Sequence, residues 1–173
     1  RMNEGAQQHH IFISVGSNIN REQHITSGLD AMHAAFGELT LSSVYESKSV
    51  GFDGNNFYNL VVQTTTTLSI ADVVDVLKQI EAKNLRTRES KKFAPRTLDL
   101  DLLTYDDVIM QQPMELPRGE ILYNAFVLQP LAEIAPDVDH PLVKKSYLAL
   151  WQQYDKSQQQ LWPIEFTWSA NRR

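Results

Sequence analysis

The chain has 173 residues, of which 42% are hydrophobic and 21% are charged, and it contains no cysteine. This composition fits one globular domain with its own core and excludes disulfides, thiolate metal sites and cysteine nucleophiles. The formal charge of −5 argues against nucleic-acid binding, and no apolar run reaches the roughly 20 residues that a membrane span requires. We therefore expect a monomeric cytoplasmic protein with no nucleic-acid or membrane partner.

Alternation of apolar residues and β-branched composition predict four strands, which cover 11–15, 39–46, 57–67 and 97–104. Apolar residues at helical spacing predict one helix after the first strand and another after the third. Asn20, with Gln23 three residues later, is the expected cap of the first helix, and Ser69, with Asp72, is that of the second. Residues 1–10 are expected to be a disordered or tag-derived N-terminus, so that the single domain covers 11–173.

The resulting order is βαββαβ, which predicts an α+β protein with a ferredoxin-like antiparallel sheet and helices packed on it. The chain continues beyond this unit with extra C-terminal elements. Residues 125–134 and 144–154 have the character of helices. The segment LWPIEF at 161–166 is expected to form an edge strand, because Pro163 cannot donate a ladder hydrogen bond in a central one.

The fourth strand carries a pair of carboxylates. Side chains two apart in a strand share a face, so Leu98, Leu100 and Leu102 are expected to point into the core. Asp99 and Asp101 then point together to the other face, where their oxygens can converge on two magnesium ions. The alternative is a solvated outer face of an edge strand.

A basic segment precedes these carboxylates. It has no apolar periodicity and contains Pro95, so we expect a long loop over 83–96, a kind of segment that is often functional. Arginine and lysine side chains there can contact phosphate oxygens, although a solvated charge run is the more ordinary reading. Phosphoryl transfer needs positioning and charge neutralisation rather than a protein nucleophile, and a basic loop beside paired carboxylates fits that chemistry.

The segment APRTLDLDLL at 94–103 closely resembles the signature of the 6-hydroxymethyl-7,8-dihydropterin pyrophosphokinases. Further segments resemble that family in the same order and spacing: GSN at 16–18, FYN at 57–59, IEAKNLRTR at 80–88 and AFVLQPLAEIAP at 125–136. The resemblance covers about residues 11–140. It implies that the hydroxymethyl oxygen of the pterin attacks the β-phosphorus of ATP, that diphosphate moves to the pterin, and that AMP leaves.

The resemblance also implies roles for individual residues. It assigns both magnesium ions to Asp99 and Asp101, and catalysis to Arg86, Arg96, Asp99 and Asp101. It implies an ATP site with Glu81, Arg86, Arg88, Lys92, Arg96 and Leu102. It implies a pterin site with Ser47, Val50, Phe57, Asn59, Asp99 and Phe126, in which the two phenylalanines sandwich the flat ring and Asn59 bonds to its edge.

The chain departs from the family pattern on the nucleotide side. After Pro117 the family commonly has a histidine and then often a tyrosine, where this chain has Arg118 and Gly119. An arginine ahead of Phe126 is replaced by Asn124, and the tryptophan that often closes the basic loop is Phe93, next to Lys92. Arg118 can supply the missing charge to ATP from a different position.

These departures leave two alternatives to the pyrophosphokinase open. One is a non-catalytic relative that binds a pterin or a nucleotide without turnover. The other is a nucleotidyl or phosphoryl transferase that uses the same pair of carboxylates on the same fold with an acceptor other than a pterin.

Overall fold

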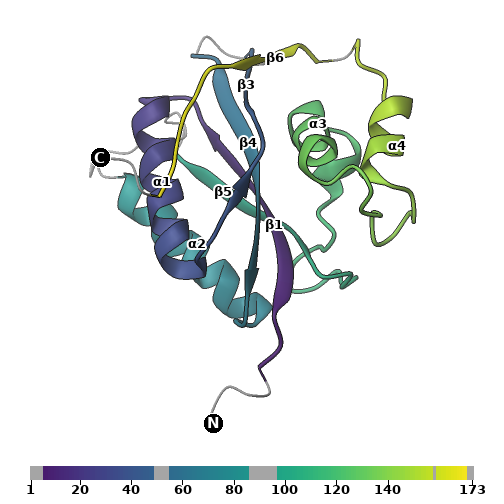
Figure 1. Ribbon diagram of the computed structural model, residues 1–173, viewed down its shortest axis with the longest axis horizontal. Coiled ribbons are helices and arrows are strands. Elements are labelled where there is room, and N and C mark those ends of the chain that lie inside the picture. The colour runs from purple at the N-terminus through teal and green to yellow at the C-terminus, as the bar shows by residue number, and fades with distance from the viewer. Residues whose placement is uncertain (1–5, 49–54, 86–96, 158, 171–173) are drawn as a thin grey trace.

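The computed structural model describes residues 6–48, 55–85, 97–157 and 159–170. The elements in chain order are β1 (His9–Ser17), α1 (Arg21–Phe36), β2 (Thr40–Leu41), β3 (Val44–Ser47), β4 (Phe57–Thr66), α2 (Ile70–Leu85), β5 (Asp99–Tyr105), the 3₁₀ helix η1 (Gly119–Leu122), α3 (Ala125–Ile134), α4 (Tyr147–Gln153) and β6 (Leu161–Ile164). They build the sheet and the two helical layers drawn in Figure 1. No helix within the described ranges has both the length and the apolar character to cross a membrane.

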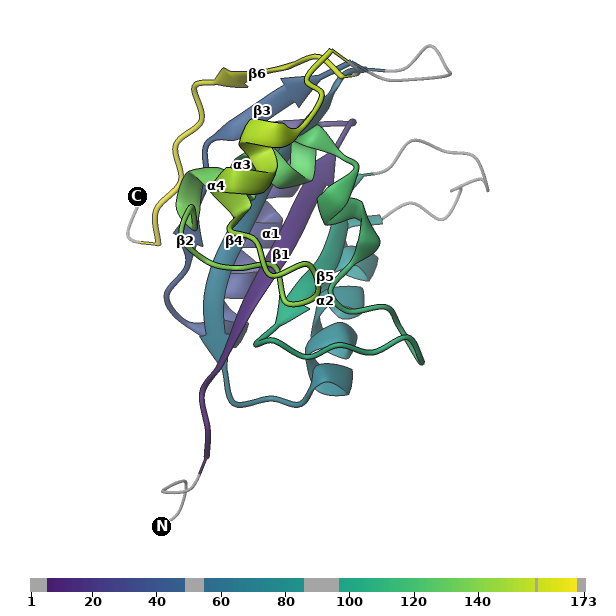
Figure 2. The same ribbon diagram turned by 90° about the vertical axis from the view of Figure 1, so that its right-hand side faces the viewer.

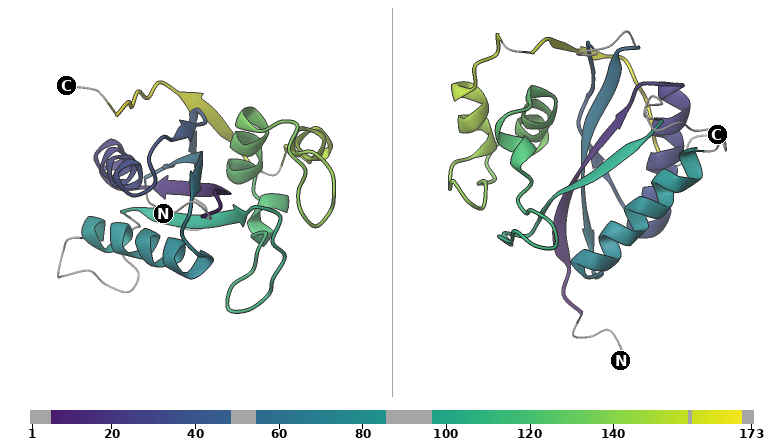
Figure 3. Two further views of the ribbon diagram at one scale, coloured as in Figure 1. Left: turned by 60° about the horizontal axis from the view of Figure 1, so that its bottom comes forward. Right: turned by 180° about the vertical axis from the view of Figure 1, so that it is seen from behind.

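The sheet has the order β5-β1-β4-β3-β6, with β2 paired to β4, and its pairs are antiparallel. The predicted ferredoxin-like order is thereby confirmed. Helices α1 and α2 cover one face, while α3 packs on the other and α4 packs on α3, as the end-on view in Figure 3 shows. The C-terminal strand β6 lies at the edge beside β3, as expected from Pro163.

Each face of the sheet supports its own core. The larger core lies under α1 and α2 and includes Ile13, Leu29, Leu60 and Leu77, all nearly or fully buried. The smaller core lies under α3 and includes Val61, Leu103, Leu128 and Tyr147. Figure 2 looks onto this second side, where α3 and α4 stand in front of the sheet.

Several predicted boundaries were wrong. The predicted strand 39–46 is split into β2 and β3, because Ser42 bonds to Val61 through both its backbone and its hydroxyl group. Helix α2 runs on to Leu85, so the predicted loop over 83–96 begins too early. The helix predicted over 144–154 begins only at Tyr147, after a Ser146 cap that accepts a hydrogen bond from the Ala149 N–H.

The two predicted caps behave differently. The Ser69 Oγ accepts a hydrogen bond from the Asp72 N–H at 3.2 Å, which confirms the cap of α2. Asn20 precedes α1 in a left-handed conformation with φ of 43° and makes no side-chain cap bond, so the predicted capping box is wrong. Strand β1 begins at His9, inside the expected N-terminal segment.

Strand β5 contains a one-residue bulge. Ile13 of β1 pairs with Leu102, but the neighbouring Phe12 pairs with Thr104, which leaves Leu103 as the extra residue. The extra residue shifts the alternation of side chains by one. Leu103 shares the face of Asp99 and Asp101 and joins the smaller core, whereas Tyr105, beyond the extra residue, joins the larger one.

Candidate active site

A row of residues crosses the sheet near the end of β1. Asp99 on β5 pairs with Gly16 on β1, and Gly16 pairs with Asn59 on β4. A Cβ atom on Gly16 would lie 2.7 Å from the Asn59 Oδ1, so a larger residue there would force the Asn59 side chain to move from its position over β1. The flanking Val15 and Leu100 belong to the larger core, so this row faces the side of the sheet that carries α3.

The two carboxylates of β5 lie on the same side of the strand. Leu98, Leu100 and Leu102 are buried, whereas Asp99 and Asp101 are only partly buried. The predicted alternation is therefore present, although β5 is the edge strand of the sheet.

This pair of carboxylates fits a hard dication. No group of three or more histidine, cysteine or acidic side chains gathered as for a metal ion occurs in the described part of the chain. Magnesium is usually bound by one or two carboxylates, keeps several waters and shares its shell with substrate phosphates. Asp99 and Asp101 are consequently a suitable donor set for magnesium brought together with a phosphate-bearing substrate.

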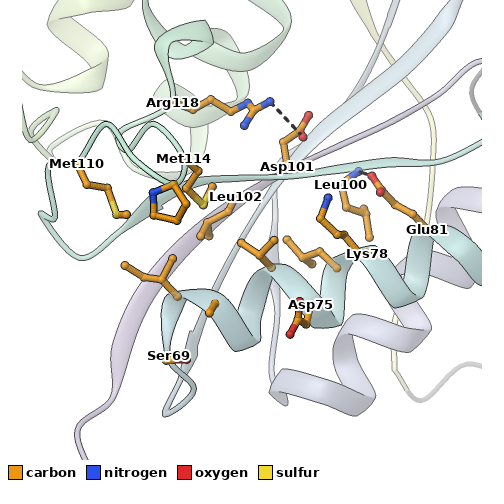
Figure 4. A pocket seen from close by; sticks show the side chains of 15 residues that line it. Ser69, Asp75, Lys78, Glu81, Leu100, Asp101, Leu102, Met110, Met114 and Arg118 are labelled. Carbon is orange, nitrogen blue, oxygen red and sulfur yellow. Dashed lines mark hydrogen bonds and ion pairs between the residues drawn. The ribbon is translucent and has the colours of Figure 1, made fainter.

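A cavity of about 690 Å³ runs along the free edge of β5, between α2 and the chain from Met110 to Arg118. Its apolar lining comes mainly from the side chains of Val74, Leu77, Leu102, Met110 and Met114. Figure 4 shows the two methionines on one side, Lys78 and Glu81 on the other, and Asp101 with Arg118 above them. The cavity thus joins an apolar slot to a charged end.

Glu81 closes part of the β5 edge. Its Oε2 accepts a hydrogen bond from the Leu100 N–H at 2.7 Å. Burial raises the pKa of this carboxyl, the negative charges of Asp99 and Asp101 raise it further, and the Leu100 N–H and Lys78 oppose the rise. The charged end therefore holds closely spaced negative groups that a bound cation would stabilise.

Arg118 reaches the same end from the opposite side. Its Nη2 lies 3.4 Å from the Asp101 Oδ1, and its Nε donates to the Glu120 Oε1 at 3.4 Å. Its backbone N–H donates to the carbonyl of Leu103, the bulged residue of β5, at 2.9 Å. The backbone bond to the bulged residue therefore holds Arg118 at a point of β5 two residues beyond Asp101, the carboxylate that its guanidinium contacts.

The residues expected around the pterin lie on one end of the sheet. Ser47 pairs with Phe57 across β3 and β4, and Asn59 lies two residues further along β4. Phe126 is in the first turn of α3, which packs against β3 and β4. Of the expected ATP contacts, Glu81, Leu102 and Arg118 all line the cavity. Val50, Arg86, Arg88, Lys92 and Arg96 lie outside the described residues.

The sequence reasoning missed part of the cavity. Val74 and Lys78 precede Glu81 by seven and three residues on α2, a spacing that places them on one helix face, and this signal was readable. Met110 and Met114 carried no such signal, because they lie in irregular chain, in a loop that the bridge between Met110 and Leu116 closes.

Two departures from the family pattern have local explanations. The Gly119 N–H donates to the Glu115 Oε1 at 3.2 Å, and a Cβ atom on Gly119 would lie 3.0 Å from that oxygen. The Asn124 amide donates to Glu120 and accepts from Gln159, whose own oxygen accepts the Ala125 N–H at the start of α3. Asn124 therefore anchors α3 to the C-terminal segment.

Comparison with known proteins gives a consistent picture. A family model described as 7,8-dihydro-6-hydroxymethylpterin-pyrophosphokinase matches residues 12–136. The chain is 32% identical over 138 residues to a 2-amino-4-hydroxy-6-hydroxymethyldihydropteridine pyrophosphokinase of Aquifex aeolicus, an alignment that covers 78% of this chain and 86% of the relative. It is 34% identical over 168 residues to a protein of the same name from Synechocystis, covering 91% and 82% respectively.

Solved structures share the fold. Wild-type Plasmodium falciparum HPPK-DHPS with pterin and p-hydroxybenzoate superposes with a TM-score of 0.70 at 14% identity, over 89% of this chain and 44% of that one. At this identity the likeness shows the fold alone. The chain spans less than half the length of that protein.

Proposed function

This chain belongs to the 7,8-dihydro-6-hydroxymethylpterin-pyrophosphokinase family, and from that premise we propose that Asp99 and Asp101 bind the two magnesium ions of its reaction. The chain transfers diphosphate from ATP to the hydroxymethyl group of 6-hydroxymethyl-7,8-dihydropterin and so takes part in folate biosynthesis. We further propose that it works as a monomer in the cytoplasm with only small-molecule substrates, which its acidic charge and lack of cysteine support.

The cavity along β5 is the proposed nucleotide site. Its apolar lining suits the flat base of ATP, and its charged end suits the phosphates. Arg118 and Lys78 supply positive charge there, with the basic residues Arg86, Arg88, Lys92 and Arg96 as further proposed contacts. Burying the base against Leu102 and the methionines would fix the triphosphate along the edge of β5.

The pterin site is proposed on the α3 side of the sheet. Phe57 and Phe126 would hold the ring between them, and Asn59 with Ser47 would accept and donate hydrogen bonds at its polar edge. Asn59 is 6% exposed and Ser47 8% exposed, so a ligand reaching them would be well removed from water. Val50 completes the proposed site by its resemblance to the family.

The chemistry is an in-line displacement. The hydroxymethyl oxygen forms a bond to the β-phosphorus, the bond from that phosphorus to the α-phosphate oxygen breaks, and the hydroxyl proton is released. Bound magnesium would neutralise the phosphate oxygens during this transfer. The residues of the chain hold the two substrates in line and exclude water, which suffices because the transfer needs little covalent help.

One observation carries the proposal. Asp99 pairs in register with Gly16 beside Asn59, and Asp101, two residues on, lines the cavity. A single strand thus presents one carboxylate to the proposed pterin site and the other to the proposed nucleotide site. Metal held by both would lie where the two substrates meet.

The test is a product assay with ATP, magnesium and the reduced pterin alcohol. We expect AMP and the pterin diphosphate, and a fall of about a thousandfold or more in kcat for Asp101→Asn because the transferring charge loses its counterion. Asp107→Asn, which removes an exposed carboxylate just beyond β5, is the matched control and should retain full activity. ADP as the product, or full activity in Asp101→Asn, would contradict the proposal. Pterin binding without AMP would identify a non-catalytic relative.

A further inference from the structure

Arg118 has a fixed backbone and a less constrained side chain. Its N–H is held by the Leu103 carbonyl at 2.9 Å, whereas its guanidinium makes two contacts of 3.4 Å, one to Asp101 and one to Glu120. The side chains of Arg118 and Asp101 are 34% and 37% exposed. Contacts this long and this exposed are weak and are readily exchanged for a better partner.

The partner that Arg118 contacts is itself a proposed metal ligand. Asp101 has one carboxylate, and a dication bound to it would repel a guanidinium at the same oxygens. Arg118 also lines the cavity proposed for ATP, so its guanidinium has an alternative set of anionic oxygens within reach of the same backbone position. Metal and Arg118 therefore compete for the Asp101 carboxylate. Arg118, in contrast, can contact Asp101 first and the nucleotide phosphates afterwards.

We propose that Arg118 couples magnesium binding to nucleotide binding: it is the counterion of Asp101 in the ligand-free protein and moves to the nucleotide phosphates when Asp101 binds metal. The inference rests on the proposed metal role of Asp101. It adds that Arg118 opposes metal binding before the nucleotide arrives and favours nucleotide binding afterwards. Arg118 is in this sense a positioning residue with two alternating partners.

This exchange predicts effects of opposite sign on the two ligands. Removing the guanidinium frees Asp101, so a dication alone should bind more tightly. The same change deprives the phosphates of a cation, so the metal–nucleotide complex should bind more weakly. A variant that had merely lost its fold or its cavity would bind both the dication and the metal–nucleotide complex more weakly.

The first measurement uses Mn²⁺ alone as the probe, with the free ion counted by electron paramagnetic resonance. Arg118→Gln should lower the Kd for Mn²⁺ about threefold to fivefold, the range expected from losing a partly exposed ion pair. Lys78→Gln is the matched control, because it removes one positive charge from the lining of the same cavity. We expect a change of less than about twofold there. An unchanged or higher Kd in Arg118→Gln, or an equal gain in Lys78→Gln, would overturn the inference.

The second measurement is calorimetry with a non-hydrolysable ATP analogue at saturating Mg²⁺. Arg118→Gln should raise the Kd about tenfold, as expected for the loss of one charge-assisted contact to phosphate. A Kd equal to that of the wild-type chain would also overturn the inference.

Asp101→Asn separates this inference from the proposed function. Its affinity for Mn²⁺ should fall, and adding Arg118→Gln to it should then bring no gain. If Asp101→Asn binds Mn²⁺ like the wild-type chain, the proposed metal site is wrong and the inference fails with it. If Asp101→Asn loses Mn²⁺ while Arg118→Gln gains nothing, only the role of Arg118 is wrong.

Discussion

The two sides of β5 differ in what they contribute. On one side Leu100 and Leu102, together with Leu98 just before the strand, are between 2% and 5% exposed and belong to the larger core. On the other side Asp99 and Asp101 remain partly exposed and adjoin the proposed substrate sites. Up to Leu102, strand β5 thus divides its stabilising and its functional side chains between its faces.

This division means that the leucines and the aspartates should respond to substitution in different assays. A buried leucine is held by dispersion and burial, and its loss is felt throughout the fold. A carboxylate placed beside other carboxylates raises the free energy of the folded state unless a cation is present. Under the proposed function, the aspartates serve the chemistry of the site rather than the stability of the fold.

The largest effect on stability is expected for Leu102→Ala. Removing a side chain that is 2% exposed should lower the free energy of unfolding by about 3 kcal/mol, through lost burial and the cavity left behind. Urea denaturation followed by circular dichroism measures it. Asp99→Asn is the control and should change stability by less than about 0.5 kcal/mol. A greater loss in Asp99→Asn than in Leu102→Ala would contradict the division between the two faces.

An intermediate effect is expected at Asp106, a carboxylate just past β5 that has a structural role. Burial alone would raise its pKa, but hydrogen bonds from His9 at 2.6 Å and from the His10 N–H at 2.8 Å, with the charges of both histidines, bring the pKa below its ordinary value. Asp106→Asn should therefore lower the free energy of unfolding at pH 7 by about 1 kcal/mol. Asparagine tolerates the φ of 52° at this position, so no backbone strain is added.

The pH dependence of this effect has a defined sign. Because the folded pKa of Asp106 is lower than the unfolded one, its contribution is complete above the ordinary aspartate pKa of about 3.9. It is lost as the pH falls from there through the lower folded value. The difference between wild type and Asp106→Asn should accordingly shrink in acid. A difference that grows in acid would contradict the assignment.

The smallest effect is expected for Glu81→Gln. Glutamine keeps an oxygen for the Leu100 N–H but removes a negative charge near Asp99 and Asp101. Since the folded pKa of Glu81 is raised, its charged form destabilises the fold at neutral pH, and Glu81→Gln should raise the free energy of unfolding at pH 7 by less than about 0.5 kcal/mol. The gain should vanish below the ordinary glutamate pKa of about 4.3. Glu81→Ala, which also loses the hydrogen bond, should instead be less stable than the wild type at pH 7.

Periodicity predicted the parts of the molecule that local patterns determine. The alternation around Asp99 and Asp101 predicted both the buried side and the site side of β5. The predicted helix 125–134 coincides with α3, because its apolar residues serve one core. The order of strands followed from the spacing of the patterns, since few topologies connect six such elements without crossing.

Long-range contacts determined what the sequence did not reveal. The cavity needs α2 and the chain near Met114 on either side of the β5 edge, and nothing local to either segment indicates the other. The contact between Arg118 and Asp101 likewise depends on the backbone bond to Leu103. At Asn20, a left-handed backbone overrode a favourable capping pattern.

Because of its extra residue, strand β5 should tolerate a change of amino acid at Leu103 better than a change in its length. Substituting Leu103 changes one side chain and keeps the backbone carbonyl that accepts the Arg118 N–H. Deleting it would remove that carbonyl together with the side chain buried in the smaller core. Arg118 would then lose the backbone bond that places its guanidinium beside Asp101, although Thr104 and Tyr105 would keep their partners Phe12 and Ile11 on β1. Among related chains, amino-acid exchanges at this position should therefore be tolerated far more often than a gap.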